Sequence, residues 1–283
     1  MLMGQPEVHN LSNANHLFPE LSRSKISIIV PVFNEARNIV DNLDLLISEI
    51  EEYFPRFEIL VVSDGSTDET NLRVFSFRHP DVKLIVVEKN MGKGHAVRSG
   101  FKRAVGEYIL FIDGGMELHP REIKIFVGLM ALYQADIVIG SKRHPQSNVD
   151  YPWYRKFLSL MFQIVIRNIF YVDVTDTQVG IKLFRRQVID AILPHLEINR
   201  YGFDLELLCL ARTFGYGKVL EAPVRLDYFD RNNRNLLKDL YHVLRVGFSL
   251  LGDTWALYRR LKRFNATEIK NEVKGGKTES AAQ

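Results

Sequence analysis

Cysteine is nearly absent from this sequence. Its 283 residues include one, Cys209, so no disulfide bond can form within one chain. This favours a reducing compartment, and we expect a cytoplasmic protein. Cys209 lies in an apolar helical pattern and is expected to be a small core residue. With 46% hydrophobic and 25% charged residues, the composition is that of a globular protein with a sizeable core.

Long hydrophobic runs are also missing. The longest uncharged, mainly apolar runs are residues 125–135 and 157–166, and both are shorter than the roughly 18 to 20 residues of a transmembrane helix. Residues 1–24 are polar and lack the pattern of a signal peptide, so we expect a tail. The net charge of +3 is too small to indicate nucleic-acid binding. We therefore predict a protein that does not cross a membrane by itself and has no nucleic-acid partner.

Several familiar site motifs are absent. The sequence has no Gly-x4-Gly-Lys-Ser/Thr loop, and no Gly-x-Gly-x-x-Gly follows the first predicted strand. Its eight histidines show no zinc-site spacing, and no nucleophile elbow supports Ser/His/Asp hydrolysis. Phosphate groups would therefore be bound by a metal ion and Lys93 rather than by a Walker loop.

The sequence does contain a regular alternation of strands and helices. The predicted strands are residues 25–35, 57–63, 82–87, 108–112, 136–140, 181–184 and 218–226. The predicted helices are residues 36–54, 68–78, 95–105, 123–133, 151–171, 187–193, 203–214 and 236–264. This order predicts an α/β fold with a mostly parallel sheet and helices on both faces. Pro223 restricts the last strand to an edge.

Charged residues collect at the carboxyl ends of these strands. Glu35, Asp64, Lys93, Asp113 and Glu117 all fall at such ends, where ligands bind in open α/β sheets. Random placement would scatter these residues over helix faces. The coincidence predicts one shared site.

The stretch from Tyr108 to Glu117 is the most informative part of that site. An apolar strand runs up to Asp113, two glycines follow, and Glu117 comes next. If the chain stays extended, Asp113, Gly115 and Glu117 share one face, because strand side chains alternate. Oxygen donors on one face would suit a hard divalent cation that carries a diphosphate. The alternative is a strand that ends in an ordinary acidic turn.

Seven short motifs, taken in order, resemble the family 2 nucleotide-diphospho-sugar glycosyltransferases, which have the GT-A fold. The matching segments are residues 30–35, 62–68, 90–94, 111–115, 139–142, 176–184 and 201–208. The last two resemble polyprenyl- and dolichyl-phosphate hexosyltransferases, the dolichyl-phosphate β-glucosyltransferases more than the dolichol-phosphate mannose synthases. The resemblance covers about residues 25–230.

The resemblance implies a donor site. It assigns Pro31, Glu35 and Asp64 to the nucleotide-sugar, and it places Lys93 near the diphosphate. Asp113 would be the first acid of an Asp-x-Asp motif that holds Mg²⁺ or Mn²⁺.

The sequence departs from that motif at one position, where Gly115 replaces the second acid. This puts metal dependence in question. Glu117 lies where the mannose synthases use a further oxygen ligand, so it is a candidate to complete the metal site with Asp113.

The resemblance also implies an acceptor site. A lipid phosphate is already ionised, so the site has to align two anions rather than create a nucleophile with a strong base. Arg143, Arg155 and Ser159 match contacts to the acceptor phosphate, and Asp176 is expected to orient the sugar or the acceptor. We count Asp113, Asp176 and Arg155 as candidate catalytic residues.

Further basic residues would add positive charge around the acceptor. The basic residues expected to flank the site are Lys142, Arg143, His144, Arg155, Lys182 and Arg185. For Lys182 and Arg186 a solvated surface charge is the simpler interpretation.

We therefore expect an inverting transferase that moves a hexose from UDP-glucose or GDP-mannose to polyprenyl or dolichyl phosphate. Two alternatives stay open: a transferase with a non-lipid acceptor, and a non-catalytic sugar-nucleotide subunit, which Gly115 alone supports.

The expected domain order is a tail (1–24), the catalytic domain (25–230), amphipathic helices (231–264) and a disordered tail (265–283). The basic aromatic residues near 255–264 favour binding at the cytoplasmic face of a membrane, with packing on the protein's own core or on a partner chain as the alternatives. Whether a separate membrane protein anchors the chain is left open.

Overall fold

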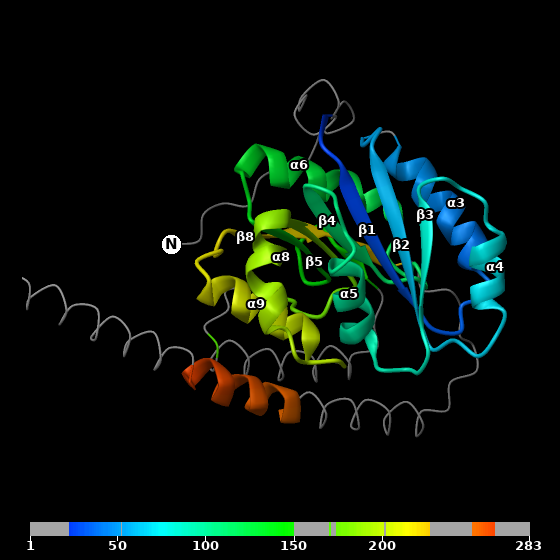
Figure 1. The fold of residues 1–283 in the computed structure, drawn as a ribbon. Helices are drawn as coiled ribbons and strands as arrows, with labels where there is room; N and C mark the ends of the chain where they lie inside the picture. Colours follow the sequence, from blue (N-terminus) through cyan, green and yellow to red (C-terminus); the bar gives the residue numbers. More distant parts are fainter. Residues whose placement is uncertain are drawn as a thin grey trace, which may run out of the picture.

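A seven-stranded sheet forms the centre of the protein (Figure 1). The computed structural model describes residues 23–51, 53–149, 170, 174–200, 202–226 and 251–263. The strands lie in the order β3-β2-β1-β4-β7-β5-β8. Their bounds are β1 (Ile26–Val32), β2 (Phe57–Asp64), β3 (Val82–Val87), β4 (Tyr108–Ile112), β5 (Ile137–Ser141), β7 (Ile181–Arg185) and β8 (Val219–Pro223). Two short strands, β6 (Asn148–Val149) and β9 (Arg225–Leu226), pair with each other in a second sheet.

The large sheet is parallel except at β7. Strands β1, β2, β3 and β4 pair in parallel, as do β5 and β8. Strand β7 lies between β4 and β5 and runs antiparallel to both. Its first residue, Ile181, therefore lies beside the carboxyl end of β4, and its last, Arg185, lies beside the start of β4.

Helices cover both faces of the sheet, as the sequence predicts. Their bounds are α3 (Ile39–Ile50), α4 (Thr70–Ser76), α5 (Lys93–Phe101), α6 (Ile123–Tyr133), α8 (Arg186–Ile192) and α9 (Phe203–Thr213). Residues from α3, α4 and α6 pack in one hydrophobic core, and residues from α5, α8 and α9 pack in the other. Side chains alternate along β1, so this strand contributes to both cores: Ile28 and Val30 enter the first core, and Ile29 enters the second.

Two strand predictions need correction. The segment 218–226 is not one strand, because the chain leaves the large sheet after Pro223 and continues as β9 in the small one. The predicted edge position is confirmed, since β8 is the last strand of the sheet. The stretch after β4 is not extended: Met116 N–H donates to the Asp113 carbonyl at 2.9 Å, and Met116 has φ of 47°. Asp113, Gly115 and Glu117 therefore do not share the face of a strand.

A helix over residues 251–263 packs against the second core. Leu257 is 1% exposed and joins that core, whereas Trp255 is 61% exposed. Figure 1 shows this helix, in orange, as a separate element below α9. The predicted helix at 151–171, apart from residue 170, and the predicted helix before residue 251 lie outside the described residues. Among the described residues, no helix is both long enough and apolar enough to cross a bilayer.

Candidate active site

Asp64 organises the loop that begins α5. It is the last residue of β2, and its carboxylate accepts hydrogen bonds from the backbone N–H groups of Met91, at 3.0 Å, and Gly92, at 2.7 Å. Gly92 has φ of 103°, and a Cβ there would stand 2.5 Å from the carbonyl oxygen of Asn199. Only glycine fits this turn, which delivers Lys93 as the first residue of the helix. Asp64, which is predicted to bind the nucleoside, therefore also fixes the backbone of the loop that leads to Lys93.

The turns after β1 and β2 are bonded to each other. Glu35 N–H donates to Thr70 Oγ1 at 2.8 Å, and Ala36 N–H donates to Asp68 Oδ2 at 3.1 Å. Asp68 Oδ1 in turn accepts from the Thr70 N–H at 3.0 Å, which satisfies a donor at the start of α4. Asn34, with φ of 56°, adds a bond from the Thr67 N–H. These bonds place Glu35 and the turn that follows Asp64 on one rim of the sheet.

Asp113 pairs with Lys93. The Lys93 Nζ lies 2.7 Å from Asp113 Oδ1, and the Asp113 side chain is 47% exposed. The backbone beside it is tightly packed, because Asp113 N–H donates to the Gly180 carbonyl at 2.9 Å and a Cβ on Gly180 would stand 2.0 Å from Asp113 Oδ2. The next residue, Gly114, donates to the Pro31 carbonyl at 3.2 Å. Pro31, Lys93 and Asp113, three predicted donor-site residues, are thus brought together.

Lys182 is a buried partner of this pair, contrary to its interpretation as a solvated charge. It is fully buried, and its Nζ donates to Asp204 Oδ1 at 2.5 Å and to the Val179 carbonyl at 2.8 Å. Asp204 Oδ2 also lies 3.9 Å from Lys93 Nζ. Two lysines and two acids therefore form one neutral group, which we call the lysine–acid cluster: Lys93, Asp113, Lys182 and Asp204.

The two lysines of the cluster differ electrostatically. Burial lowers the pKa of the Lys182 ammonium below its ordinary value, with partial opposition from Asp204. Burial acts in the same direction on Lys93, but the charges of Asp113 and Asp204 outweigh it and raise the pKa of Lys93. Both ammonium groups lie over the Phe111 ring, at 5.3 Å for Lys93 and 5.0 Å for Lys182. Sequence reasoning placed Lys182 near the site but missed its burial and its pairing with Asp204, although a lysine inside an apolar strand pattern signals a buried ion pair.

The loop between residues 174 and 180 connects the donor side to the acceptor side. At one end Gly180 packs on Asp113. Toward the other end the Asp176 carboxylate accepts from the Lys142 N–H at 3.3 Å and from the Gln178 N–H at 3.2 Å. Burial lowers the pKa of the Arg143 guanidinium. The negative charge of Asp176, together with that of another nearby acid, opposes this shift in part. The predicted Asp176 and Arg143 therefore lie together.

The other predicted acceptor residues have mixed outcomes. Arg155 and Ser159 lie outside the described residues. Arg185 does not flank the site, because it lies in register with Tyr108 at the opposite end of β4. Arg186 is not merely solvated either, since its guanidinium donates to the carbonyls of Gly106, at 2.6 Å, and Ala104, at 2.9 Å.

The family follows from comparison with known proteins. The family model for glycosyl transferase family 2 matches residues 27–193. The chain belongs to this family. The human dolichyl-phosphate beta-glucosyltransferase is 32% identical to this transferase over 243 residues, which cover 80% of the chain and 74% of the human protein. The Dictyostelium discoideum enzyme of the same name is 30% identical over 272 residues, with 86% and 82% covered.

A relative from Trichomonas vaginalis, named as a dolichyl-phosphate beta-glucosyltransferase, is 35% identical over 212 residues. The match covers 70% of this chain and 62% of that protein. Among solved structures, glucosyl-3-phosphoglycerate synthase from Mycobacterium tuberculosis, in complex with Mn²⁺, UDP and its product, superposes with a TM-score of 0.63. It is 19% identical, with 89% of this chain and 86% of that chain covered, and it confirms the predicted GT-A fold.

The transferase offers few protein ligands for a divalent cation. No group of three His, Cys, Asp or Glu side chains within the described residues is arranged to hold a metal. Glu117 is exposed, and its role as a ligand stays a prediction. Glu35 lies near the position of the missing acid, because a Cβ on Gly115 would stand 3.5 Å from Glu35 Oε1. Mg²⁺ often uses one or two carboxylates plus substrate phosphates. These residues fit a cation that is held partly by the protein and partly by the diphosphate, rather than a preformed cage.

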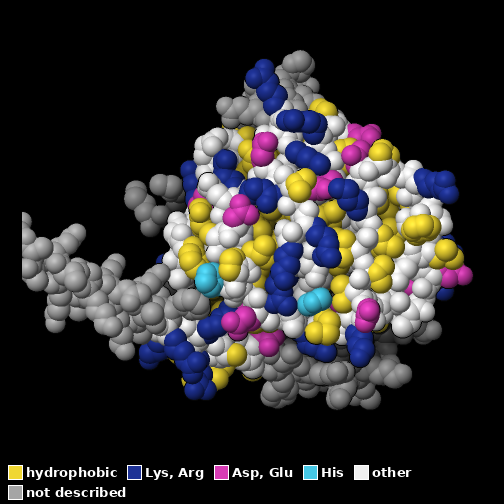
Figure 2. Space-filling model, viewed as in Figure 1, with side chains coloured by type: hydrophobic (Ala, Val, Ile, Leu, Met, Phe, Trp, Pro, Cys, Tyr) yellow, Lys and Arg dark blue, Asp and Glu magenta, His cyan; other side chains and the backbone are white. Residues whose placement is uncertain are grey.

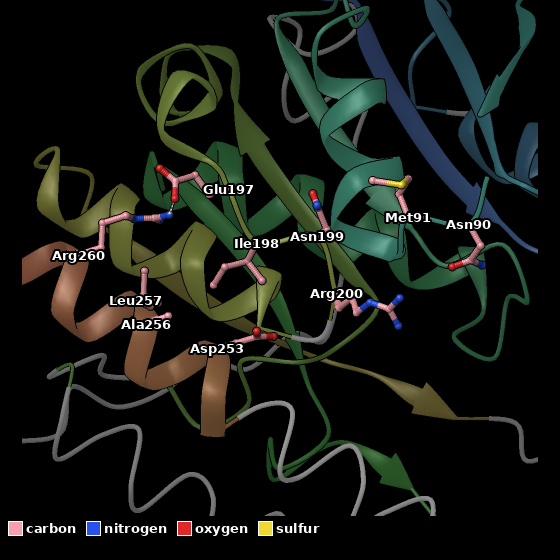
Figure 3. Close-up of a pocket in the computed structure, with 10 residues that line it drawn as sticks. All are labelled: Asn90, Met91, Glu197, Ile198, Asn199, Arg200, Asp253, Ala256, Leu257 and Arg260. Atoms are coloured by element: carbon pink, nitrogen blue, oxygen red, sulfur yellow. Dashed lines mark ion pairs between the residues drawn. The ribbon is translucent and has the colours of Figure 1, made fainter. Parts of the chain in front are cut away.

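A cavity of about 480 Å³ lies beside the lysine loop of the transferase (Figure 3). Asn90 and Met91 line one side, residues 197–200 another, and the helix 251–263 the third. At one end of it Arg260 pairs with Glu197 (Figure 3), and the ion pair has an N–O distance of 2.9 Å. Arg260 also pairs with the buried Glu206, whose Oε2 accepts from the Ile198 N–H at 2.9 Å. The helix is thereby tied to the loop that packs on Gly92.

Proposed function

We propose that this family 2 glycosyltransferase moves a hexose, with inversion, from a nucleotide-diphosphate donor to polyprenyl or dolichyl phosphate. One structural observation carries the proposal: the 174–180 loop places Asp113 and Lys93 beside the segment that holds Asp176 and Arg143. This arrangement supports a diphosphate site and an acceptor-anion site at one edge of the sheet. The names of the relatives support dolichyl phosphate as the acceptor and glucose as the hexose.

On the donor side, the departing diphosphate needs positive charge. Lys93 is the candidate, because the α5 N-terminus points it at Asp113 and because nearby acids keep its ammonium charged. A divalent cation bound at Asp113, with Glu117 or Glu35 as a further ligand, would supply charge neutralisation as a Lewis acid. Pro31, Glu35 and Asp64 complete the proposed donor site. UDP-glucose is the favoured donor and GDP-mannose the alternative.

On the acceptor side, the lipid phosphate is itself the nucleophile. One of its oxygens forms the bond to the anomeric carbon while the bond from that carbon to the diphosphate breaks, and the electron pair leaves with the nucleoside diphosphate. No proton has to be removed from a phosphate that is already ionised. Arg143, together with the predicted Arg155 and Ser159, would hold the acceptor, and Asp176 would orient it.

The C-terminal region supports binding at a membrane surface. The helix 251–263 exposes Leu251 and Trp255, and Trp255 stacks on Tyr258 with ring centroids 5.8 Å apart. Figure 2 shows Lys and Arg side chains gathered where Figure 1 places this helix. Aromatic groups with flanking positive charge suit the boundary of an anionic bilayer. We infer a catalytic domain at 25–230, an interfacial region at 231–264, and a location at the cytoplasmic face.

The test is direct transfer. Purified protein is incubated with radiolabelled UDP-glucose, Mg²⁺ and a polyprenyl phosphate, and label in the organic phase is measured, with Arg143→Gln as the acceptor-side variant. We expect lipid-linked glucose, strongly reduced for Arg143→Gln. Label that stays in the aqueous phase with UDP-glucose and with GDP-mannose, while a related enzyme is active under the same conditions, contradicts the proposal. Transfer to a water-soluble acceptor only would identify the non-lipid alternative.

A further inference from the structure

Lys93 stands between two acids that differ in freedom. Its Nζ lies 2.7 Å from Asp113 Oδ1 and 3.9 Å from Asp204 Oδ2. Asp113 is on a turn at the rim, and its side chain is 47% exposed. Asp204 is 5% exposed in the first turn of α9, and the buried Lys182 holds its other oxygen. One partner of Lys93 is therefore accessible to a ligand, and the other is fixed in the core.

Lys182 has no comparable freedom. It is fully buried, and it bonds the Val179 carbonyl as well as Asp204. Moving it would leave Asp204 as an uncompensated buried charge, which is costly. Lys182 and Asp204 therefore form a fixed, buried ion pair. Beside it, the Lys93 ammonium can change its ion-pair partner without leaving the site.

Because Gly115 replaces the second acid, Lys93 and a metal ion compete directly for the carboxylate of Asp113. Asp113 is the acid that remains from the Asp-x-Asp motif, and an ammonium already neutralises it. A divalent cation that binds Asp113 Oδ1 has to replace this ammonium. The backbone of Lys93 is fixed, because Asp64 holds the preceding Gly92 N–H at 2.7 Å, so the exchange requires only rotation of a flexible side chain.

We propose that Lys93 is an exchangeable internal cation: it neutralises Asp113 in the donor-free protein and transfers to the donor diphosphate when a divalent cation takes Asp113. Asp204, held by Lys182, acts as the positioning residue that keeps the displaced ammonium at the site. The proposal rests on the proposed function, because it needs a diphosphate as the second partner of Lys93. It makes cation and donor binding cooperative, since the cation frees the lysine that the diphosphate then binds.

The test compares metal binding with donor binding in Lys93→Met, which keeps the length of the side chain and removes its charge. Mn²⁺ affinity is measured by electron paramagnetic resonance on donor-free protein, and UDP affinity by calorimetry in saturating Mg²⁺. We expect the variant to bind Mn²⁺ about three- to tenfold more tightly and UDP about tenfold or more weakly. A merely structural role for Lys93 would not move the two affinities in opposite directions.

Lys102→Met is the matched control. Lys102 is exposed directly after the same helix, so its substitution removes the same charge away from Asp113. We expect neither affinity to shift by more than twofold. Unchanged or weaker Mn²⁺ binding by a folded Lys93→Met protein overturns the proposal. Failure of the proposed function is separate, because it shows as absent glucosyl transfer while these binding constants can still be measured.

A second measurement uses the unaltered chain and does not depend on the folding of a variant. Acylation of lysine side chains is quantified by mass spectrometry in the presence of EDTA, of Mg²⁺, and of Mg²⁺ with UDP. We expect Lys93 to react slowly in EDTA, at least twofold faster in Mg²⁺, and slowly again when UDP is added. Equal reactivity in EDTA and Mg²⁺ overturns the exchange. Lys182 should stay unreactive throughout because it is buried.

Discussion

Two acids at opposite ends of the sheet, Glu58 and Asp113, are held in opposite ways. At the amino ends of the strands, Glu58 is 1% exposed, and its carboxylate accepts from Ser27 Oγ at 2.7 Å, the Val105 N–H at 2.9 Å and Lys83 Nζ at 3.0 Å. At the carboxyl ends, Asp113 is about half exposed and is paired with a lysine that has a second acid nearby.

The difference separates structural acids from functional ones. A buried carboxylate with several fixed donors has no oxygen left for a ligand, so it contributes to stability. A half-exposed carboxylate with an exchangeable partner can release that partner to a ligand. Glu58 and Asp113 are therefore expected to have different roles, and substitutions should separate them.

Substitution of Lys182 is the strictest test of this comparison. Lys182 lies near the candidate site, but it is buried and bonded to Asp204 and to the Val179 carbonyl, as a structural group is. Replacing it by Met leaves Asp204 buried without its partner, and we expect a loss of about 3–5 kcal/mol in the free energy of unfolding. Urea denaturation measures this loss in the free energy of unfolding. The double variant Lys182→Met with Asp204→Leu should recover part of the loss. A single variant as stable as the parent would mean that the cluster is not desolvated.

Asp113→Asn tests the functional end. Removing the charge that orients Lys93 and the cation should lower kcat for glucosyl transfer by about 10²- to 10³-fold. The melting temperature should change little, because the side chain is half exposed. The comparison fails if this variant loses stability and keeps its turnover.

Glu58→Gln is the matched change at the structural end, and we expect a loss of about 1–3 kcal/mol with kcat unchanged in the folded protein. Burial acts to raise the pKa of Glu58, but hydrogen bonds from Ser27, Val105 and Lys83 outweigh it and lower the pKa below its ordinary value. Its stabilising contribution is therefore complete above the unfolded-state pKa and is lost as pH falls through the folded-state pKa.

Unfolding curves from pH 7 to pH 3 should show the gap between the parent and Glu58→Gln closing as the pH falls. A gap of constant size across that range would show that ionisation of Glu58 does not contribute to stability.

Trp255→Ala extends the comparison to the helix 251–263, for which we propose membrane binding, and it has the smallest expected effect on catalysis. Flotation with anionic vesicles should show several-fold weaker binding, because an exposed indole suited to the interface is removed. Turnover with a short water-soluble acceptor should stay within about twofold of the parent. Leu132→Ala, which also removes an exposed apolar side chain, is the control on a different helix. Equal vesicle binding by both variants would contradict an interfacial role for the helix.

Local patterns in the sequence predicted much of this fold. The helix predicted at 36–54 contains α3, which buries five apolar residues at helical spacing, and the limits of β3 and α6 agree with the prediction. Acids at strand ends predicted which edge of the sheet carries the candidate site, because parallel strands bring their carboxyl ends together.

What the sequence could not show depends on contacts between distant segments. The burial of Lys182 follows from Asp204, a residue of another element, and no local pattern records that pairing. The direction of β7 places Arg185 at the far end of the sheet, whereas its spacing from Lys182 suggests proximity to the site. The turn at Met116 is stabilised by the Asp113 carbonyl against the alternation expected of a strand.

The position of β7 also sets the order in which the chain can become protected during synthesis. Strands β1 to β4 can pair as they emerge, but β5 pairs only with β7 and β8, which are both made later. Until residues 181–185 leave the ribosome, β4 is an open edge with unpaired backbone groups, the kind of edge that invites association between chains. The strand that leads to Asp113 is therefore an aggregation hazard in the nascent protein, and a chain that stops before residue 181 would keep that hazard permanently.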